Sequence, residues 1–202
     1  MIYTKEKGRW KESLKKVEKL CVGNKILDVG ADYGYLTNFL MKKGYDVTGI
    51  DINRSVIKEA KKRYGIKIKF QDVRNLSPRE KYDTIVILGI LEYLDEDPSE
   101  MLTRLGKNLN KGGRIIFSVS NIHSIKQRLK CLLGLEPIED FYTRNYQFTK
   151  KRIIRVIKKT LFNIIKLTTL KVVRIKNFQL PMPDLLAEDF LVVINRKSQE
   201  LD

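Results

Sequence analysis

Apolar and amphipathic segments alternate over the first 120 residues of the chain. Runs or alternations of branched apolar residues predict strands at 25–29, 46–50, 66–70, 84–88 and 114–120. The stretches between them repeat apolar residues every three or four positions, which is typical of helices that cover a sheet. This alternation predicts an α/β fold in which helices wrap a parallel sheet on both faces.

Local signals mark the ends of three predicted helices. The first, with its apolar face at Leu36, Phe39 and Leu40, ends at Gly44. Asn53 can cap the second helix at its start, and Gly65 can end it, because glycine adopts the backbone conformation that closes a helix. The third carries apolar residues from 101 to 109 and is predicted to end at Gly112.

The pattern changes after residue 120. Residues 121–144 predict a short helix and a loop. A helix is predicted over 150–165, with an apolar face made of Ile153, Ile154, Ile157, Leu161 and Ile164. Two strands at 170–178 and 189–195 are predicted to form a closing hairpin on the sheet.

Composition narrows the class of protein. The 202 residues are 43% hydrophobic, which excludes wholesale disorder and fits one domain. Forty Lys and Arg against 24 Asp and Glu give a net charge of +16, which predicts attraction to nucleic acid, phosphorylated metabolites or an anionic membrane surface. A general lysine bias would produce the same balance.

The basic residues concentrate in the segment 144–176, where eleven Lys and Arg occur without any acidic residue. Two interpretations stay open for this segment. It is either a solvated helix face or an anion-binding surface for RNA, a phosphorylated substrate or lipid headgroups.

Several features are missing from the sequence. Cys21 and Cys131 are the two cysteines, without a CxxC pair, so no metal site and no disulfide framework are predicted. No apolar run reaches the ~18 residues that span a bilayer. The N-terminus scatters charges where a signal peptide needs an apolar stretch, so a cytoplasmic location is expected.

Polar residues and glycines follow the predicted strands. Gly30 and Gly34 form a turn after the first strand, and Asp51 and Asp72 follow the second and third strands. Ligands of open parallel sheets bind beyond the carboxyl ends of the strands. A carboxylate at position 51 could accept hydrogen bonds from both hydroxyls of a ribose.

The turn does not follow the dinucleotide pattern GxGxxG. From Gly30 that pattern needs glycine at the positions of Asp32 and Tyr35, and Asp32 would repel a pyrophosphate. A nicotinamide-dependent oxidoreductase is therefore disfavoured. A nucleoside with a cationic amino-acid end, such as S-adenosylmethionine, fits the carboxylates better.

Four segments resemble the motifs of class I S-adenosylmethionine-dependent methyltransferases, of the small-molecule type. They are residues 25–37, with the turn DVGADYG, then 47–51, 81–94 and 105–121, in the order and spacing of that family. The resemblance implies a doubly wound, Rossmann-like sheet of seven strands, mostly parallel with an antiparallel last strand.

The resemblance also implies roles for particular residues. It predicts an N-terminal helical extension at 1–20, a cofactor-binding core at 21–121, and substrate-side helices and closing strands at 122–202, all within one domain. The implied contacts to S-adenosylmethionine are Asp28, Gly30, Asp32, Gly34, Asp51, Ile52, Asp72, Val73 and Leu88. Among these, Asp28 supports the turn and Asp72 meets the adenine amino group.

The chain departs from the family pattern where catalysis is concerned. Tyr93 follows Glu92 where many members have a histidine, and His123, the only histidine, comes just after the fifth strand. Tyr93 is interpreted either as a catalytic residue or as a residue that contacts a lid. Glu92 is interpreted as the partner in a salt bridge. His123 is either a general base or an idle surface residue.

The function predicted from the sequence is methyl transfer from S-adenosylmethionine to a small molecule, which could be phosphorylated or otherwise anionic. An RNA methyltransferase that uses the basic segment 144–176 is one alternative. A relic domain that binds a nucleoside without turnover is another.

Overall fold

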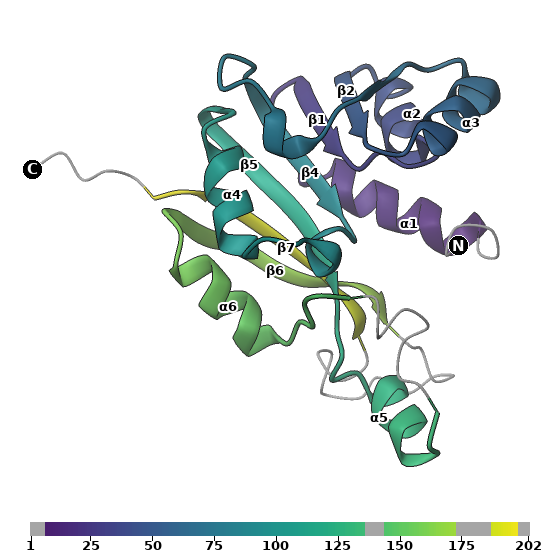
Figure 1. The fold of residues 1–202 in the computed structure, drawn as a ribbon, viewed down its shortest axis with the longest axis vertical. Coiled ribbons are helices and arrows are strands. Elements are labelled where there is room, and N and C mark those ends of the chain that lie inside the picture. The colour runs from purple at the N-terminus through teal and green to yellow at the C-terminus, as the bar shows by residue number, and fades with distance from the viewer. Residues whose placement is uncertain (1–6, 136–143, 173–186, 198–202) are drawn as a thin grey trace, which may run out of the picture.

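A seven-stranded sheet with helices on both faces forms the body of the protein (Figure 1). We describe a computed structural model, which places residues 7–135, 144–172 and 187–197. The strand order is β3-β2-β1-β4-β5-β7-β6. The strands are β1 Lys25–Val29, β2 Asp46–Asp51, β3 Ile68–Phe70, β4 Tyr82–Leu88, β5 Leu109–Ser120, β6 Phe162–Val172 and β7 Ala187–Arg196.

Strands β1 to β5 are parallel to one another, and β7 lies antiparallel between β5 and β6. The prediction of a doubly wound, mostly parallel sheet with an antiparallel last strand is confirmed. The strand order reverses where β1 and β4 lie side by side. Such a reversal leaves a crevice at the carboxyl ends of the two strands, because the connections leave in opposite directions there.

Six helices and two short 3₁₀ turns connect the strands in the described part of the chain. They are α1 Lys7–Glu18, α2 Tyr35–Met41, α3 Arg54–Tyr64, η1 Val73–Asn75, η2 Leu91–Tyr93, α4 Pro98–Gly106, α5 Ile125–Leu132 and α6 Lys150–Lys158. Within residues 7–135, 144–172 and 187–197, no helix has the length and apolar character that a membrane span requires.

The central strands are apolar because helices cover both of their faces. Neighbouring side chains on a strand point to opposite faces. Ile26 and Ile116 therefore pack with α1 and α2 on one side, while Leu27 and Ile115 pack with α4 and α6 on the other. All four side chains are fully buried, as expected for strands inside a layered α/β fold.

The predicted helix caps are present. The side chain of Asn53 accepts a hydrogen bond from the backbone N–H of Ser55 at 2.9 Å and starts α3. Gly65 ends α3 in the left-handed conformation, with φ 68°, and its N–H donates to the carbonyl of Lys61. The short helix expected within 121–144 is α5, which Ser124 caps by accepting from the N–H of Gln127.

One predicted helix is too long. The helix expected to end at Gly112 ends at Gly106, where a Cβ atom would lie 2.7 Å from the ring of Phe162. The chain then enters β5 at Leu109, which pairs with Tyr82 of β4 and is buried. Pairing with β4 provides hydrogen-bond partners for the backbone at the start of β5. This tertiary contact outweighs the helical spacing that places Leu109 in the predicted helix.

The helix predicted at 150–165 is also too long. It ends at Lys158, and the predicted inward residues Leu161 and Ile164 are 73% and 36% exposed. Strand β6 starts at Phe162 and pairs with β7, so the strand expected at 170–178 begins eight residues earlier. Residues 173–178 lie outside the described part. The closing hairpin itself is confirmed. The sequence of residues 159–165 is compatible with either a helix or a strand, and the long pairing of β6 with β7 selects the strand.

Candidate functional site

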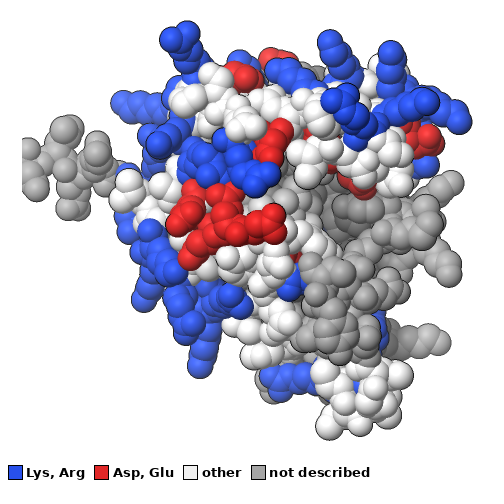
Figure 2. Space-filling view, in the orientation of Figure 1, with Lys and Arg blue, Asp and Glu red and all other residues white. Residues whose placement is uncertain are grey.

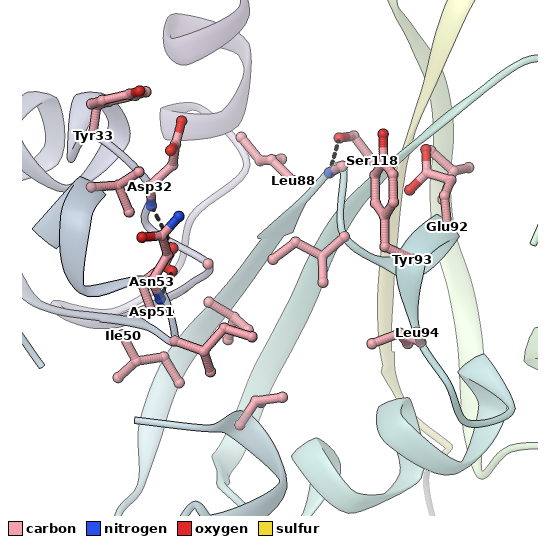
Figure 3. A pocket seen from close by; sticks show the side chains of 18 of the residues that line it. Asp32, Tyr33, Ile50, Asp51, Asn53, Leu88, Glu92, Tyr93, Leu94 and Ser118 are labelled. Atoms are coloured by element: carbon pink, nitrogen blue, oxygen red, sulfur yellow. Dashed lines mark hydrogen bonds between the residues drawn. The ribbon is translucent and has the colours of Figure 1, made fainter. Parts of the chain in front are cut away.

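A cleft of about 970 Å³ lies at the carboxyl ends of the parallel strands (Figure 3). Its walls come mainly from the carboxyl ends of five strands and the residues that follow them, within 30–35, 50–56, 71–74, 88–96 and 118–120, with additional residues from α1. This is the position where ligands bind in doubly wound sheets, and the volume suits a small-molecule ligand.

The turn after β1 forms one wall. The backbone N–H groups of Gly30 and Ala31 both donate to the carbonyl of Ile50, at 2.9 and 3.0 Å, which ties the turn to the end of β2. Gly30 has φ 66°, and a Cβ atom there would overlap the Cδ1 atom of Ile90. Glycine is therefore needed at this position both for its backbone conformation and for the close approach of the loop after β4.

Asp51 lies at the end of β2 and faces the cleft. Its Oδ2 atom accepts a hydrogen bond from the N–H of Asp32 at 2.9 Å, and its Oδ1 atom accepts from the N–H of Asn53 at 2.8 Å. Each carboxylate oxygen can accept a further hydrogen bond, because it has two lone pairs. Asp51 is thus held in place from both sides and can still bind hydroxyl groups of a ligand.

Asp32 is strained and partly buried. Its φ of 49° is the single positive value among the described non-glycine residues. Burial raises the pKa of its carboxyl, and the charge of Asp51 adds to this rise, while the N–H of Tyr33 opposes it. A bound cation would stabilise the ionised form of this carboxylate.

Asp72 caps the 3₁₀ turn η1 and already has a cationic partner. It accepts from the N–H of Arg74 at 2.8 Å, and its Oδ2 atom lies 2.6 Å from the guanidinium of the same residue. The hydrogen bond from the guanidinium of Arg74 is the main cause that holds the pKa of Asp72 below its ordinary value. A ligand amino group at Asp72 would have to share the carboxylate with Arg74.

The structure brings most of the predicted site residues to the cleft. Those that line it are Gly30, Asp32, Asp51, Ile52, Asp72, Val73, Leu88 and Tyr93. Three predicted residues do not line it, namely Asp28, Gly34 and His123.

Asp28 and Gly34 lie behind the turn. Asp28 lines only a small adjacent cavity of about 20 Å³, and it accepts a hydrogen bond from the hydroxyl of Thr37 at 2.6 Å. Burial raises its pKa to about 6. Gly34 has φ 76°, and a Cβ atom there would lie 3.2 Å from the Cβ atom of Ala60 in α3. Both residues hold the turn in shape rather than facing the cleft.

The two predicted catalytic residues lie in different environments. His123 is exposed, and its backbone N–H donates to the side chain of Asn121 at 3.1 Å. Tyr93 is 39% exposed on the wall of the cleft, with the guanidinium of Arg144 5.2 Å from the centre of its ring. Only Tyr93 is therefore positioned to meet a ligand in the cleft.

The wall of the cleft contains a buried ion pair that the sequence does not predict as part of the site. Glu92 is 2% exposed, and its Oε1 atom lies 3.4 Å from Nη1 of Arg144. The salt-bridge interpretation of Glu92 is confirmed. Its partner Arg144 belongs to the basic segment 144–176, for which the sequence predicts only a solvated or anion-binding surface. The apolar neighbours Leu91 and Leu94 were a signal that Glu92 is buried, and nothing near Arg144 in the sequence gave a comparable signal.

The charge of the cleft differs from that of the whole chain. Its lining includes seven carboxylates, Asp32, Asp51, Asp72, Glu92, Asp95, Glu96 and Asp189, and three arginines, Arg63, Arg74 and Arg144. Each arginine already pairs with a carboxylate, that of Glu59, Asp72 or Glu92. Figure 2 shows lysine and arginine side chains around much of one face, with the largest group of acidic side chains near its centre. The cleft therefore favours a cationic or neutral ligand.

Comparison with known proteins identifies the type of domain. A family model described as a methyltransferase domain matches residues 4–170. A ubiquinone biosynthesis O-methyltransferase of Coxiella burnetii is 32% identical over 122 residues, which are 57% of this chain and 51% of that protein. The protein of the same name from Pseudomonas savastanoi is 30% identical over 139 residues, 65% of this chain and 59% of that protein. The chain thus spans little more than half the length of these relatives.

Solved structures share the fold. Magnesium protoporphyrin IX methyltransferase from Synechocystis, with bound SAH, superposes with a TM-score of 0.69 at 20% identity, over 94% of this chain and 84% of that one. The N-methyltransferase NodS from Bradyrhizobium japonicum, also with SAH, gives a TM-score of 0.64 at 17% identity, over 95% and 89% of the two chains. At these identities the likeness establishes the fold.

Proposed function

We propose that this chain, which belongs to the methyltransferase-domain family, transfers a methyl group from S-adenosylmethionine to a small-molecule acceptor. The observation that carries the proposal is the carboxylate of Asp51, held by two backbone N–H groups at the end of β2 and facing the cleft. Its position after the second strand is suited to bind the two hydroxyls of a ribose.

The other residues of the cleft fit the same ligand. Asp32, whose pKa is raised by burial, would pair with the ammonium group of the amino-acid end. Asp72 would accept from the adenine amino group. Ile52, Val73 and Leu88 add apolar side chains to the lining of the cleft. The excess of carboxylates over arginines also suits a sulfonium cation better than a dinucleotide pyrophosphate.

The acceptor would occupy the part of the cleft between Leu88 and Tyr93. Arg144 is the cation on this side and already pairs with Glu92, so the lining favours an uncharged acceptor over an anionic one. No residue of α6, which carries much of the basic segment, lines the cleft. An RNA substrate therefore has less support than a small molecule.

S-adenosylmethionine supplies an activated methyl group on a good leaving group, so the protein mainly has to orient the two reactants and exclude water. In this chain Asp51 and the turn at Gly30 would fix the nucleoside. Tyr93, held beneath Arg144, would pack against the acceptor and shield it from solvent. A strong general base is not required for an acceptor that is already nucleophilic.

Titration calorimetry with S-adenosylhomocysteine tests the proposal. We expect Asp51→Ala to weaken binding about tenfold to a hundredfold, because a charge-assisted hydrogen bond contributes roughly 1.5–3 kcal/mol. Asp46→Ala is the matched control, since Asp46 lies at the other end of β2 and does not line the cleft. Equal affinities of Asp51→Ala and the wild type would refute the site. Tight binding without methyl transfer to a panel of hydroxyl and amine acceptors would support the relic instead.

A further inference from the structure

Helix α5 presents apolar side chains to solvent. Ile125, Leu129, Leu132 and Leu133 fall on one side of the helix, because they are spaced by four, three and one residues. None of the residues of α5 is buried, and Leu129, Leu132 and Leu133 are 52%, 82% and 73% exposed. A surface helix ordinarily turns such a stripe toward the core, so this one lacks the usual reason for its apolar face.

Basic side chains border the stripe. At 100° per residue, Lys126 and Lys130 lie along one edge of it and Arg128 along the other. No acidic residue occurs between positions 121 and 135. The helix therefore combines an apolar face with cationic edges, in a chain whose net charge is +16.

The helix is anchored at its start and projects from the fold. Asn121 and Ser124, which precede it, are both buried, and Ser124 caps the helix. Lys126 pairs with Glu188 at the start of β7, with 2.8 Å between Nζ and Oε1. Figure 1 shows α5 at the lower end of the molecule, apart from the sheet. The helix follows the end of β5, where Ser120 lines the cleft.

We propose that α5 is a docking surface for an anionic lipid bilayer. The leucines would enter the boundary between headgroups and acyl chains, while Arg128 and Lys130 meet the anionic headgroups. Charge complementarity argues for this occupant over a second copy of the chain, because two copies would bring like charges together along the edges of the stripe. The proposal is independent of methyl transfer.

Sedimentation of the full chain with extruded vesicles tests the proposal. We expect the protein to bind vesicles of phosphatidylcholine mixed with phosphatidylglycerol, and to bind pure phosphatidylcholine vesicles far more weakly. Added salt should weaken binding to the mixed vesicles, since it screens the attraction between exposed charges. Failure to bind the mixed vesicles at low salt would overturn the proposal.

Matched variants locate the surface. Leu133 and Leu161 are both 73% exposed, and Leu161 lies between α6 and β6. We expect Leu133→Ser to weaken vesicle binding about tenfold, because it removes apolar area that would enter the bilayer. Leu161→Ser should leave binding unchanged. Equal losses in the two variants, or no loss in either, would contradict the assignment to α5.

Two further measurements exclude the other occupants. If a segment of the chain covers the stripe, Leu133→Ser will lower the melting temperature well below that of Leu161→Ser, and the proposal fails. If a second copy covers it, light scattering will show a dimer that Leu133→Ser dissociates, and the proposal fails in the same way. We expect equal melting temperatures for the two variants and no difference in molecular mass from the wild type.

Discussion

Glu92 and Arg144 form an ion pair inside the wall of the cleft, with side chains that are 2% and 5% exposed. The Oε1 atom of Glu92 also accepts from the N–H of Ser120 at 2.8 Å, and its backbone carbonyl accepts from the N–H of Tyr146 at 2.9 Å. Burial raises the pKa of Glu92, the N–H of Ser120 and the charge of Arg144 oppose the rise, and Asp189 adds to it. Through its carboxylate and its backbone carbonyl, Glu92 thus connects η2 with the end of β5 and with the segment at 144–146.

Removal of the cation alone should be more harmful than removal of both charges. We expect Arg144→Met to lower the free energy of unfolding by about 3 kcal/mol, because it leaves Glu92 charged and buried. The double variant with Glu92→Gln should recover much of that loss, since the glutamine can still accept from Ser120. Urea unfolding of the single and double variants measures the coupling. Arg63→Met, which breaks the more exposed pair with Glu59, is the control and should leave the free energy of unfolding nearly unchanged. Additive effects of the two buried substitutions would contradict the coupling.

Gly30 should be intolerant of alanine for two separable reasons. Gly65 has nearly the same φ, 68° against 66°, but nothing lies within 4 Å of a Cβ atom there. We expect Gly65→Ala to cost about 1 kcal/mol from backbone strain alone. Gly30→Ala should cost roughly 1–3 kcal/mol more, because its Cβ atom meets Ile90. In the double variant, Ile90→Ala should relieve the steric overlap but not the backbone strain. Urea unfolding of the single and double variants measures the two contributions. A Gly30→Ala protein no less stable than Gly65→Ala would disprove the close approach.

Asp28 should make the protein less stable as the pH rises. Its pKa in the folded state is about 6, raised chiefly by burial, against an ordinary value of 3.8. The folded state therefore binds more protons than the unfolded state between these values, and stability falls as the pH rises through that range. We expect Asp28→Asn to remove this fall, with a difference of up to about 3 kcal/mol at neutral pH. Urea unfolding across the range tests this, and parallel pH profiles of the two proteins would rule it out.

Asp97 should have the opposite pH dependence. A hydrogen bond from Lys159 at 2.9 Å, with others from Ser99, lowers its pKa to about 2. The stabilisation is present above the ordinary pKa and is lost as the pH falls toward 2. Because both side chains are more than a third exposed, we expect Lys159→Gln to cost only about 0.5 kcal/mol at neutral pH. Nuclear magnetic resonance titration of Asp97 should show a higher pKa in this variant, and an unchanged pKa would mean that Lys159 is not its main partner.

Short-range signals were sufficient for the first half of the fold. The strand predicted at 25–29 has the bounds of β1, and Asn53 and Gly65 cap α3 as expected. These features depend on neighbours within about four residues, so the sequence pattern contains the information needed to predict them. Asp51 and the glycine turn were predictable for a related reason, because carboxyl ends of parallel strands meet at one edge of the sheet.

The later segments depended on partners far away in the sequence. Residues 159–165 have both helical spacing and branched apolar residues, and only the pairing of β6 with β7 chooses the strand. Asp28 and Gly34 have the same local context as the residues that face the cleft. Their inward position follows from packing against Thr37 and α3, which the turn motif alone does not reveal.

By itself, the sequence determined the order of strands and helices, the position of the turn and the acidic residue at the end of β2. Each of these rests on local backbone preferences and on the general geometry of parallel sheets. Only the tertiary structure decided how the charges are distributed. A net charge of +16 predicted an affinity for anions, yet the folded chain gathers seven carboxylates around the cleft and buries Arg144 against Glu92. Net charge is a sum over the whole chain, whereas a ligand responds to the groups that folding places around it.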